Sequence, residues 1–299
     1  MVADNTMLHY GSRIGARTRP PNGGPGFWRV VEAERTVRLY WELAVRGFQR
    51  TAMYRTAAIS GAITNTFFGF LRAYVFIALY EARPEAGGYS LSDALTFTFV
   101  TQGMASLVEL WAWWRIAETV QTGQVATDLS RPFDYQLYWL AQDYGRALHQ
   151  FLLRSLPPFF IGMIAFDVRL PPDAVHWLAL VPSLGLAITV SFGWRFCLNL
   201  TTFWWMDYRG AAGIASLVAM LLSGFLVPLA MFPDSVRTGI YLMPLASMVA
   251  IPIDVFLGKL NGWDLLGALS LQAFWALAML WIGRIVLGAA LRKLVVQGG

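Results

Sequence analysis

The residue types that could carry out catalysis or bind metal are few and scattered in this 299-residue sequence. One cysteine, Cys197, permits neither a disulfide framework nor a cysteine-based zinc site. The three histidines, His9, His149 and His176, lie too far apart in sequence to suggest a metal cluster. Phosphate-binding Gly-x-x-x-x-Gly-Lys-Ser/Thr, Gly-x-Ser-x-Gly and His-Glu-x-x-His patterns do not occur. We therefore expect no enzymatic activity, no cofactor and no metal in this chain; any ATP it uses must bind to another chain.

Three charged residues within long apolar stretches are better candidates for a functional role. An unpaired arginine near the middle of a bilayer costs at least about 2.5–3.5 kcal/mol, so Arg72 is expected to face protein or water. Arg72 would then contact a substrate or a second subunit, or else reach the outer surface. Glu109 and Arg195 are predicted to lie at similar depth, where a structural ion pair between them is the simplest arrangement.

The apolar stretches themselves predict the fold class. Hydrophobic residues make up 57% of the sequence and charged residues 14%, far fewer than the quarter typical of soluble domains. A net charge of +5 is weak evidence for nucleic-acid binding and is better explained by membrane topology. Because about 20 apolar residues cross a bilayer once, we predict an all-α integral membrane protein of about six spans, with the third bent or widened at Pro157 and Pro158. The predicted spans are 59–80, 94–114, 149–168, 177–200, 211–231 and 265–287.

Two further segments are apolar or amphipathic without being spans. Residues 27–55 alternate apolar and charged positions at helical spacing, which favours a helix lying in the membrane interface, or alternatively a soluble helix packed on a partner. Residues 241–257 are interrupted by Pro244 and Pro252, which indicates an external re-entrant hairpin. Residues 1–26 are expected to be a disordered basic tail without a signal peptide, followed by one transmembrane domain over 27–299.

The distribution of basic residues predicts orientation. Most of the 23 lysines and arginines lie in the N-terminal region, in the polar stretch 115–146 or near the C-terminus. Cytoplasmic loops carry such an excess. We therefore expect a multi-pass protein of the inner (cytoplasmic) membrane with both termini in the cytoplasm.

Several short stretches, in order, carry a resemblance to a known family. Gly123 precedes Leu129, Arg131 and Pro132 in a Gly-x-(three to five residues)-Leu-x-Arg-Pro pattern. Over roughly residues 30–299 the chain resembles the ABC-2 type (type V) exporter permeases, and more narrowly the bacterial paired-permease ABC-2 family once catalogued as an uncharacterised domain. The other stretches that carry the likeness are 203–204, 223–229, 232–233, 256–259 and 297–299.

The resemblance implies a coupling helix in the cytoplasmic loop after the second span, seated in a groove of a separate ATPase that binds ATP and Mg²⁺. Asp128 or Ser130 is expected to cap this helix, with Pro132 in its first turn. The alternative is a solvated loop that merely obeys the positive-inside rule. The expected coupling residues are Gly123, Thr127, Asp128, Leu129, Arg131 and Pro132.

The resemblance also implies a translocation path bordered by the first, second and fifth spans. For any one of its polar residues, ordinary hydrogen bonding between helices is the alternative. The candidate path residues are Arg72, Thr98, Thr101, Gln102, Gly224 and Pro228. Besides the ATPase, the expected partners are a second permease, related rather than identical, and membrane lipids, but no nucleic acid.

Two other functional classes remain open at this point. An ion-coupled secondary transporter or channel would need internal repeats and a central acidic residue, and neither is evident. An intramembrane enzyme would need a nucleophile or a metal constellation. The substrate cannot be read from the sequence, and export rather than import follows from the resemblance alone.

Overall fold

The computed structural model of the chain describes residues 25–82, 88–111, 114–205 and 208–293, and none of them forms a strand. Residues 1–24 of the predicted tail lie outside the described residues, as do the last six residues. The chain divides into two units, Met1–Tyr40 and Trp41–Gly299. Helix α1 (Pro25–Ala52) begins in the first unit and ends in the second. The helix predicted over residues 27–55 from the amphipathic pattern is confirmed as α1.

Among the residues that the structure describes, three helices are long and apolar enough to cross a membrane. They coincide with the predicted first, fourth and last spans, and α8 continues into a 3₁₀ turn, η2 (Thr201–Phe203). At 1.5 Å per residue, each exceeds the roughly 30 Å of a bilayer's hydrocarbon core. A shorter apolar helix, Ala212–Leu222, coincides with part of the predicted fifth span. The three long helices are α2 (Arg55–Ala82), α8 (Ala174–Leu200) and α12 (Gly262–Leu291).

The second predicted span is wrong in its C-terminal third. Helix α3 (Leu91–Leu107) ends well before residue 114, and Glu109 adopts a left-handed backbone conformation with φ 52°. A residue in that region cannot continue a right-handed helix. The last turn of α3 is capped from elsewhere, because Arg146 donates to the carbonyls of Ser106 (3.1 Å) and Leu107 (2.9 Å).

The fifth predicted span is likewise too long at its C-terminal end. Helix α9 (Arg209–Leu222) stops before Gly224, whose φ of 80° favours glycine, and only a 3₁₀ turn, η3 (Leu229–Met231), follows. Arg72 of α2 donates to the carbonyls of Phe225 (2.7 Å) and Leu226 (2.8 Å) in this break. Backbone carbonyls that leave a helix lose their helical partners and need other donors, which the apolar sequence alone does not reveal.

The third predicted span is preceded by an amphipathic helix and widened at the expected place. Helix α6 (Tyr135–Gln150) runs into a π-helical segment, η1 (Phe151–Ser155), and then α7 (Leu156–Ala165). Proline removes one backbone donor and clashes with the carbonyl four residues earlier. The wider π turn just before Pro157 and Pro158 accommodates the missing donor and the clash. The widening predicted from these prolines is confirmed.

The segment between α9 and α12 is made of short, broken helices, as its prolines predict. Backbone and side-chain bonds tie it to the end of α9 and to α12, since Ala250 donates to the Ser223 carbonyl (3.0 Å) and Gln272 of α12 donates to the Ser247 carbonyl (2.9 Å). Gln272 is fully buried and also bonds Ser183 of α8 (2.8 Å). The elements of this hairpin are α10 (Asp234–Tyr241), η4 (Ala246–Met248) and α11 (Ala250–Phe256).

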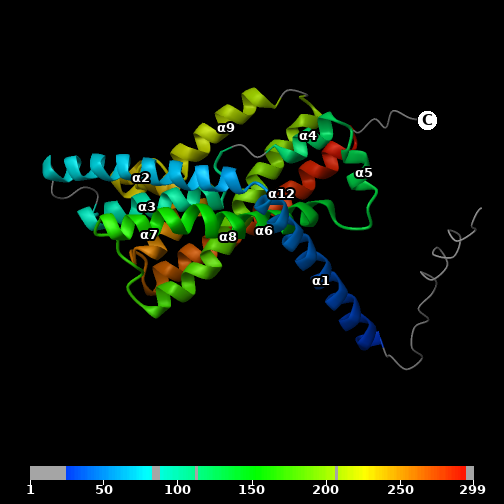
Figure 1. Cartoon of the computed structure of the whole chain (residues 1–299). Helices are drawn as coiled ribbons and strands as arrows, with labels where there is room; N and C mark the ends of the chain where they lie inside the picture. The colour runs from blue at the N-terminus through cyan, green and yellow to red at the C-terminus, as the bar shows by residue number, and fades with distance from the viewer. Residues whose placement is uncertain (1–24, 83–87, 112–113, 206–207, 294–299) are drawn as a thin grey trace, which may run out of the picture. The chain divides into compact units, whose positions relative to one another are not determined.

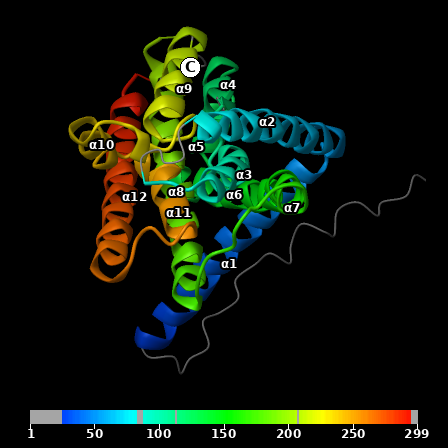
Figure 2. The same cartoon turned by 90° about the vertical axis from the view of Figure 1, so that its left-hand side faces the viewer.

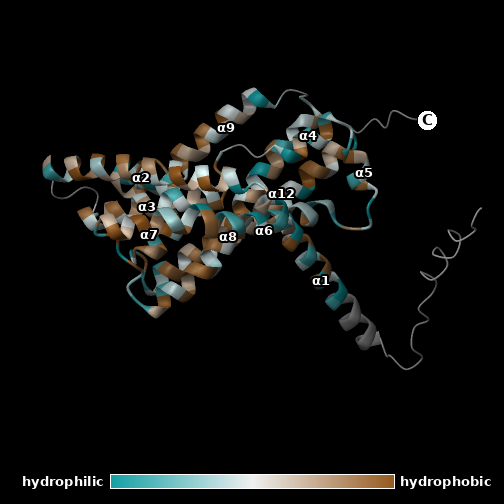
Figure 3. Ribbon diagram, viewed as in Figure 1, coloured by the Kyte–Doolittle hydropathy of each residue, from teal (hydrophilic) through white to brown (hydrophobic). Residues whose placement is uncertain are grey.

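Within the second unit the helices form two groups, which can be followed in Figure 2. One contains α2, α3 and α7, and the other contains α8, α11 and α12. Large apolar side chains remain on the outside, such as Ile63 (65% exposed), Val181 (73%) and Leu277 (70%). In Figure 3 much of the ribbon of the long helices is brown, the colour of hydrophobic residues. An apolar exterior around a core with hydrogen-bonded polar groups fits a bilayer environment.

The two short helices that follow α3, α4 (Arg115–Gln121) and α5 (Val125–Leu129), lie beside the C-terminal end of α12 (Figure 1). They occupy the loop in which the resemblance implies a coupling helix.

Candidate functional site

The α4–α5 region is anchored to the long helices by a compact apolar cluster. Phe192, Phe196 and Phe97 are among the largest fully buried side chains of the protein, and the first two belong to this cluster. A hydrogen bond also joins α4 to α8, because the Ala117 backbone N–H donates to the Asn199 side-chain oxygen at 3.0 Å. The cluster joins α4, α5 and α6 to the ends of α8 and α12 through Ile116, Val125, Tyr135, Trp139, Phe192, Phe196, Leu200, Leu287 and Ala290.

The opposite side of this region is exposed. Gly123 begins the turn into α5 with φ 75°, a conformation that favours glycine. Of the predicted coupling residues, Gly123, Thr127, Arg131 and Pro132 are exposed, whereas Asp128 and Leu129 are half-buried. The structure brings these residues together on a surface that is available to a partner. Their role in coupling to an ATPase stays a prediction.

The predicted capping pattern is wrong. Asp128 lies inside α5 and pairs with Arg131 at 3.6 Å, while Ser130 ends α5 by donating to the Thr127 carbonyl (2.8 Å). The N-cap belongs to the following helix, where Asp134 accepts from the Leu137 backbone N–H at 2.8 Å. Pro132 therefore precedes this cap and is not in a first helical turn. The helix that is capped is α6, and its cap is Asp134 rather than Asp128 or Ser130.

A buried ion network connects α3, α6 and α8 next to this region. One carboxylate, Asp143, contacts Arg146 and Arg195, each at 2.7 Å, and Arg146 also pairs with Glu109 at 2.6 Å. Asp143 is 1% exposed, and the two arginines 6% and 5%. Buried charges of this kind are tolerated when every group is paired and hydrogen-bonded. The network therefore fixes the position of α6 relative to a membrane-spanning helix.

The predicted Glu109–Arg195 ion pair is wrong, although both residues belong to the network. Asp143 takes the place of Glu109 as the partner of Arg195, and Glu109 pairs with Arg146 instead. Glu109 and Arg195 are predicted to lie at similar depth, but the segment between the predicted second and third spans folds back as α6 and contributes two further charges, Asp143 and Arg146. The acid–base spacing of Asp143 and Arg146, three residues apart in an amphipathic helix, is the signal that could have revealed them.

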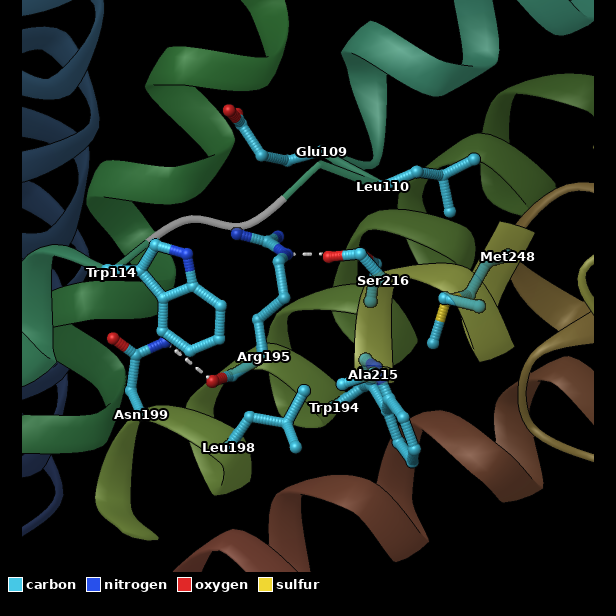
Figure 4. A pocket seen from close by; sticks show the side chains of 12 residues that line it. Glu109, Leu110, Trp114, Trp194, Arg195, Leu198, Asn199, Ala215, Ser216 and Met248 are labelled. Atoms are coloured by element: carbon cyan, nitrogen blue, oxygen red, sulfur yellow. Dashed lines mark hydrogen bonds between the residues drawn. The ribbon is translucent and has the colours of Figure 1, made fainter. Parts of the chain in front are cut away.

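A small pocket lies beside Arg195, between α8, α9 and the non-helical stretch after α3. Figure 4 shows Glu109, Trp114 and Arg195 at this pocket, with Asn199 donating to the Arg195 carbonyl (2.7 Å). Its enclosed space is about 20 Å³, room for about one water molecule. In this conformation it cannot hold a small-molecule substrate, whose sites are typically about 300–1,000 Å³.

The candidate path residues lie at the contact between α2, α3 and the end of α9. Thr98 and Thr101 are fully buried and donate to carbonyls of their own helix, at 2.9 and 2.8 Å. Gln102 is also buried, and its backbone carbonyl accepts from the Asn65 side chain of α2 (3.3 Å). Only the Asn65–Gln102 bond is the interhelical hydrogen bonding given above as the alternative, whereas the threonine bonds stay within α3. A role in a path stays a prediction.

Arg72 joins the three candidate helices. In addition to the two carbonyls in the break after Gly224, it donates to Thr101 (3.3 Å), and its guanidinium lies 5.1 Å from the centre of the Phe225 ring. The expectation that Arg72 faces protein is confirmed. Pro228 lies at the start of η3, a few residues beyond these contacts.

Long apolar helices, helix ends whose backbone carbonyls accept from the arginines Arg72 and Arg146, and an exposed helical tip on a buried apolar cluster define a polytopic α-helical membrane protein. The chain belongs to a transporter family, because the model of the ABC-2 family transporter proteins matches residues 65–298. A comparison with curated proteins finds no match. The predicted family is thus confirmed, and its members are typically non-catalytic membrane subunits.

Proposed function

We propose that the chain is the permease subunit of an ATP-driven exporter and that a separate ATPase, which binds ATP and Mg²⁺, moves it through the α4–α5 region. Support comes from one observation above all. The exposed face of α5 is backed by a buried cluster that reaches α8 and α12. Because packed interiors transmit displacement with little compression, a push on α5 would move both long helices.

The buried ion network extends this connection. It ties α6, which follows the exposed tip, to the end of α3 through Arg146 and to α8 through Arg195. A force on the tip would therefore reach both helix groups. That is the mechanical requirement for a subunit that opens a path by tilting helices without hydrolysing ATP itself.

The proposed orientation places the tip in the cytoplasm. Four arginines lie in α4, just after α5 or near the C-terminal end of α12: Arg115, Arg131, Arg284 and Arg292. This excess of basic residues favours the cytoplasmic side of an inner membrane, with both termini on that side. The broken hairpin between α9 and α12 would then face outward. The family resemblance further suggests a second, related permease beside this one.

The test begins with purification of the full chain from its host membrane in mild detergent and identification of the bound chains. We expect an ATPase with a phosphate-binding loop and a second permease. The variant Arg131→Glu should lose the ATPase while still inserting into the membrane. Arg237→Glu is a matched control, because both arginines pair with an aspartate three residues earlier and are similarly exposed, 45% and 42%.

Two results would contradict the proposal. One is an Arg131→Glu variant that retains the ATPase and stimulates it as the native chain does. The other is transport by this chain alone in liposomes, driven by an ion gradient without ATP, which would favour a secondary transporter.

A further inference from the structure

An apolar groove lies on one side of α8, where α1 and α6 approach it. Its volume is about 630 Å³, within the usual range of small-molecule sites. The groove adjoins the ion network at Leu107, whose backbone carbonyl accepts from Arg146, and none of its lining residues belongs to α4 or α5. Its walls are Trp41, Ala44, Val45 and Phe48 of α1, Leu107 of α3, Tyr144, Gly145, Leu148 and Phe151 of α6 and η1, and Val181, Leu184, Gly185 and Ile188 of α8.

Two glycines fix the wall formed by α1. A methyl group at Gly145 would lie 1.8 Å from the Ala44 carbonyl oxygen, and one at Gly47 would lie 2.3 Å from the Gln142 carbonyl oxygen. The backbones of α1 and α6 therefore touch at this crossing. Phe48 adds an edge-on contact with His149 (5.3 Å between ring centres). The groove is thus bounded by closely packed helices rather than by loosely placed side chains.

The groove offers almost no hydrogen-bonding capacity. The Tyr144 hydroxyl, its most polar side-chain group, already bonds the Gly185 carbonyl (2.9 Å) and Thr189 (2.7 Å). The other side chains that line it are aliphatic or aromatic. Transfer of a polar ligand into such a site would cost free energy without compensation, so the occupant must be a hydrocarbon.

The groove opens where the protein meets the bilayer. Trp41, Leu148 and Val181 at its rim are 66%, 52% and 73% exposed. Ile188 and Val181 are seven residues apart on α8, so this wall extends about 10 Å along the helix. That helix is one of the three candidate spans. Lipid chains are the apolar molecules that meet such a surface.

We propose that the groove binds one acyl chain of a phospholipid from the leaflet beside α1. The chain lies along α8 between Ile188 and Val181, with its headgroup near α1. Burial of apolar surface on both partners supplies the affinity. The proposal requires that α8 spans a bilayer and is independent of any ATPase, so it can fail or succeed separately from the proposed function.

The test uses the full chain in nanodiscs of phosphatidylethanolamine and phosphatidylglycerol that contain a photoreactive acyl chain. Gly185→Leu extends a side chain into the groove, and a β-carbon added at Gly185 would lie 3.9 Å from the Tyr144 hydroxyl, an ordinary van der Waals contact. Gly267→Leu is the matched control, because it places the same side chain on the exposed surface of another span with no atom within 4 Å.

We expect labelling of the Trp41 and Leu148 peptides in the native chain and about one phospholipid per chain retained after extensive detergent washing. In Gly185→Leu, labelling of both peptides should fall by about tenfold and the retained lipid should be lost. Gly267→Leu should match the native chain, and all three should melt at similar temperatures.

Equal labelling and retention in the two variants would overturn the proposal, since the contacts would then be those of bulk lipid. A disulfide between two chains carrying Leu148→Cys would also overturn it, because a second protein chain would cover the groove.

Discussion

The carboxylate of Asp143 in α6 lies 2.7 Å from the guanidinium of Arg195 in α8 and equally close to that of Arg146. One buried negative charge therefore holds two buried positive charges, and Glu109 completes the balance from the end of α3. Through this carboxylate, the helix after the exposed tip is joined to a spanning helix. Several variants test this arrangement and the other buried polar contacts.

Replacing Asp143 with asparagine should destabilise the protein by about 3–5 kcal/mol, because two buried guanidiniums lose their shared partner. The measurement is thermal unfolding of the purified chain in one detergent. Glu109→Gln should cost less, since Glu109 contacts Arg146 alone and its side chain is 24% exposed. If both variants lost the same small amount of stability, Asp143 would not be the centre of the network.

Replacing Arg72 with lysine should cost about 2 kcal/mol or more, although the charge is kept. A single ammonium group cannot reproduce the bonds to the carbonyls of Phe225 and Leu226 and to Thr101 at once. The break after α9 should then loosen, so a cysteine at Leu226 should react faster with a water-soluble thiol reagent. An unchanged reaction rate would show that Arg72 does not hold the break.

Replacing Gln272 with leucine should destabilise the contact between α8, α12 and η4 by about 1–2 kcal/mol, at the upper end of measured values for polar contacts between membrane helices. The variant leaves the Ser183 and Ser247 carbonyls without the Gln272 donor. Thermal unfolding in detergent measures the loss. Ser183→Ala removes only one of the bonds and should cost less, so equal costs would contradict a central role for Gln272.

Asp254, in the hairpin outside the spanning helices, should make stability depend on pH. Burial raises its pKa to about 6, although bonds from Tyr241 (2.8 Å) and Tyr89 (3.0 Å) favour the charged form. Between about pH 4 and 6 the folded chain therefore binds a proton more readily than the unfolded chain. The contribution of Asp254 to stability consequently increases as pH falls through this window and is lost as pH rises.

The comparison is between native protein and Asp254→Asn, unfolded thermally at several values from about pH 7 down to about pH 5. The melting temperature of the native protein should rise relative to that of the variant as pH falls. Asp234→Asn, at an exposed position of the same hairpin, should keep the native pH dependence. A constant difference between native protein and Asp254→Asn would show that Asp254 does not titrate in this window.

The sequence by itself determined the membrane class, the family and the long helices. A predominantly apolar stretch of about twenty residues leaves a chain little choice but a helix in lipid, so α2, α8 and α12 follow from the hydropathy of the sequence. The prolines at 157 and 158 likewise set the widened turn in η1, because their effect on the preceding backbone is local.

Only the tertiary structure decided where α3 and α9 end and which charges pair. The carbonyl of Leu107 at the end of α3 accepts from Arg146, 39 residues further along the chain, and the carbonyl of Phe225 just after α9 accepts from Arg72, 153 residues earlier. Arg195 finds Asp143 rather than Glu109 because the loop between spans folds back as a helix. Hydropathy measures how well each segment suits lipid, whereas these choices depend on donors and charges supplied by distant segments.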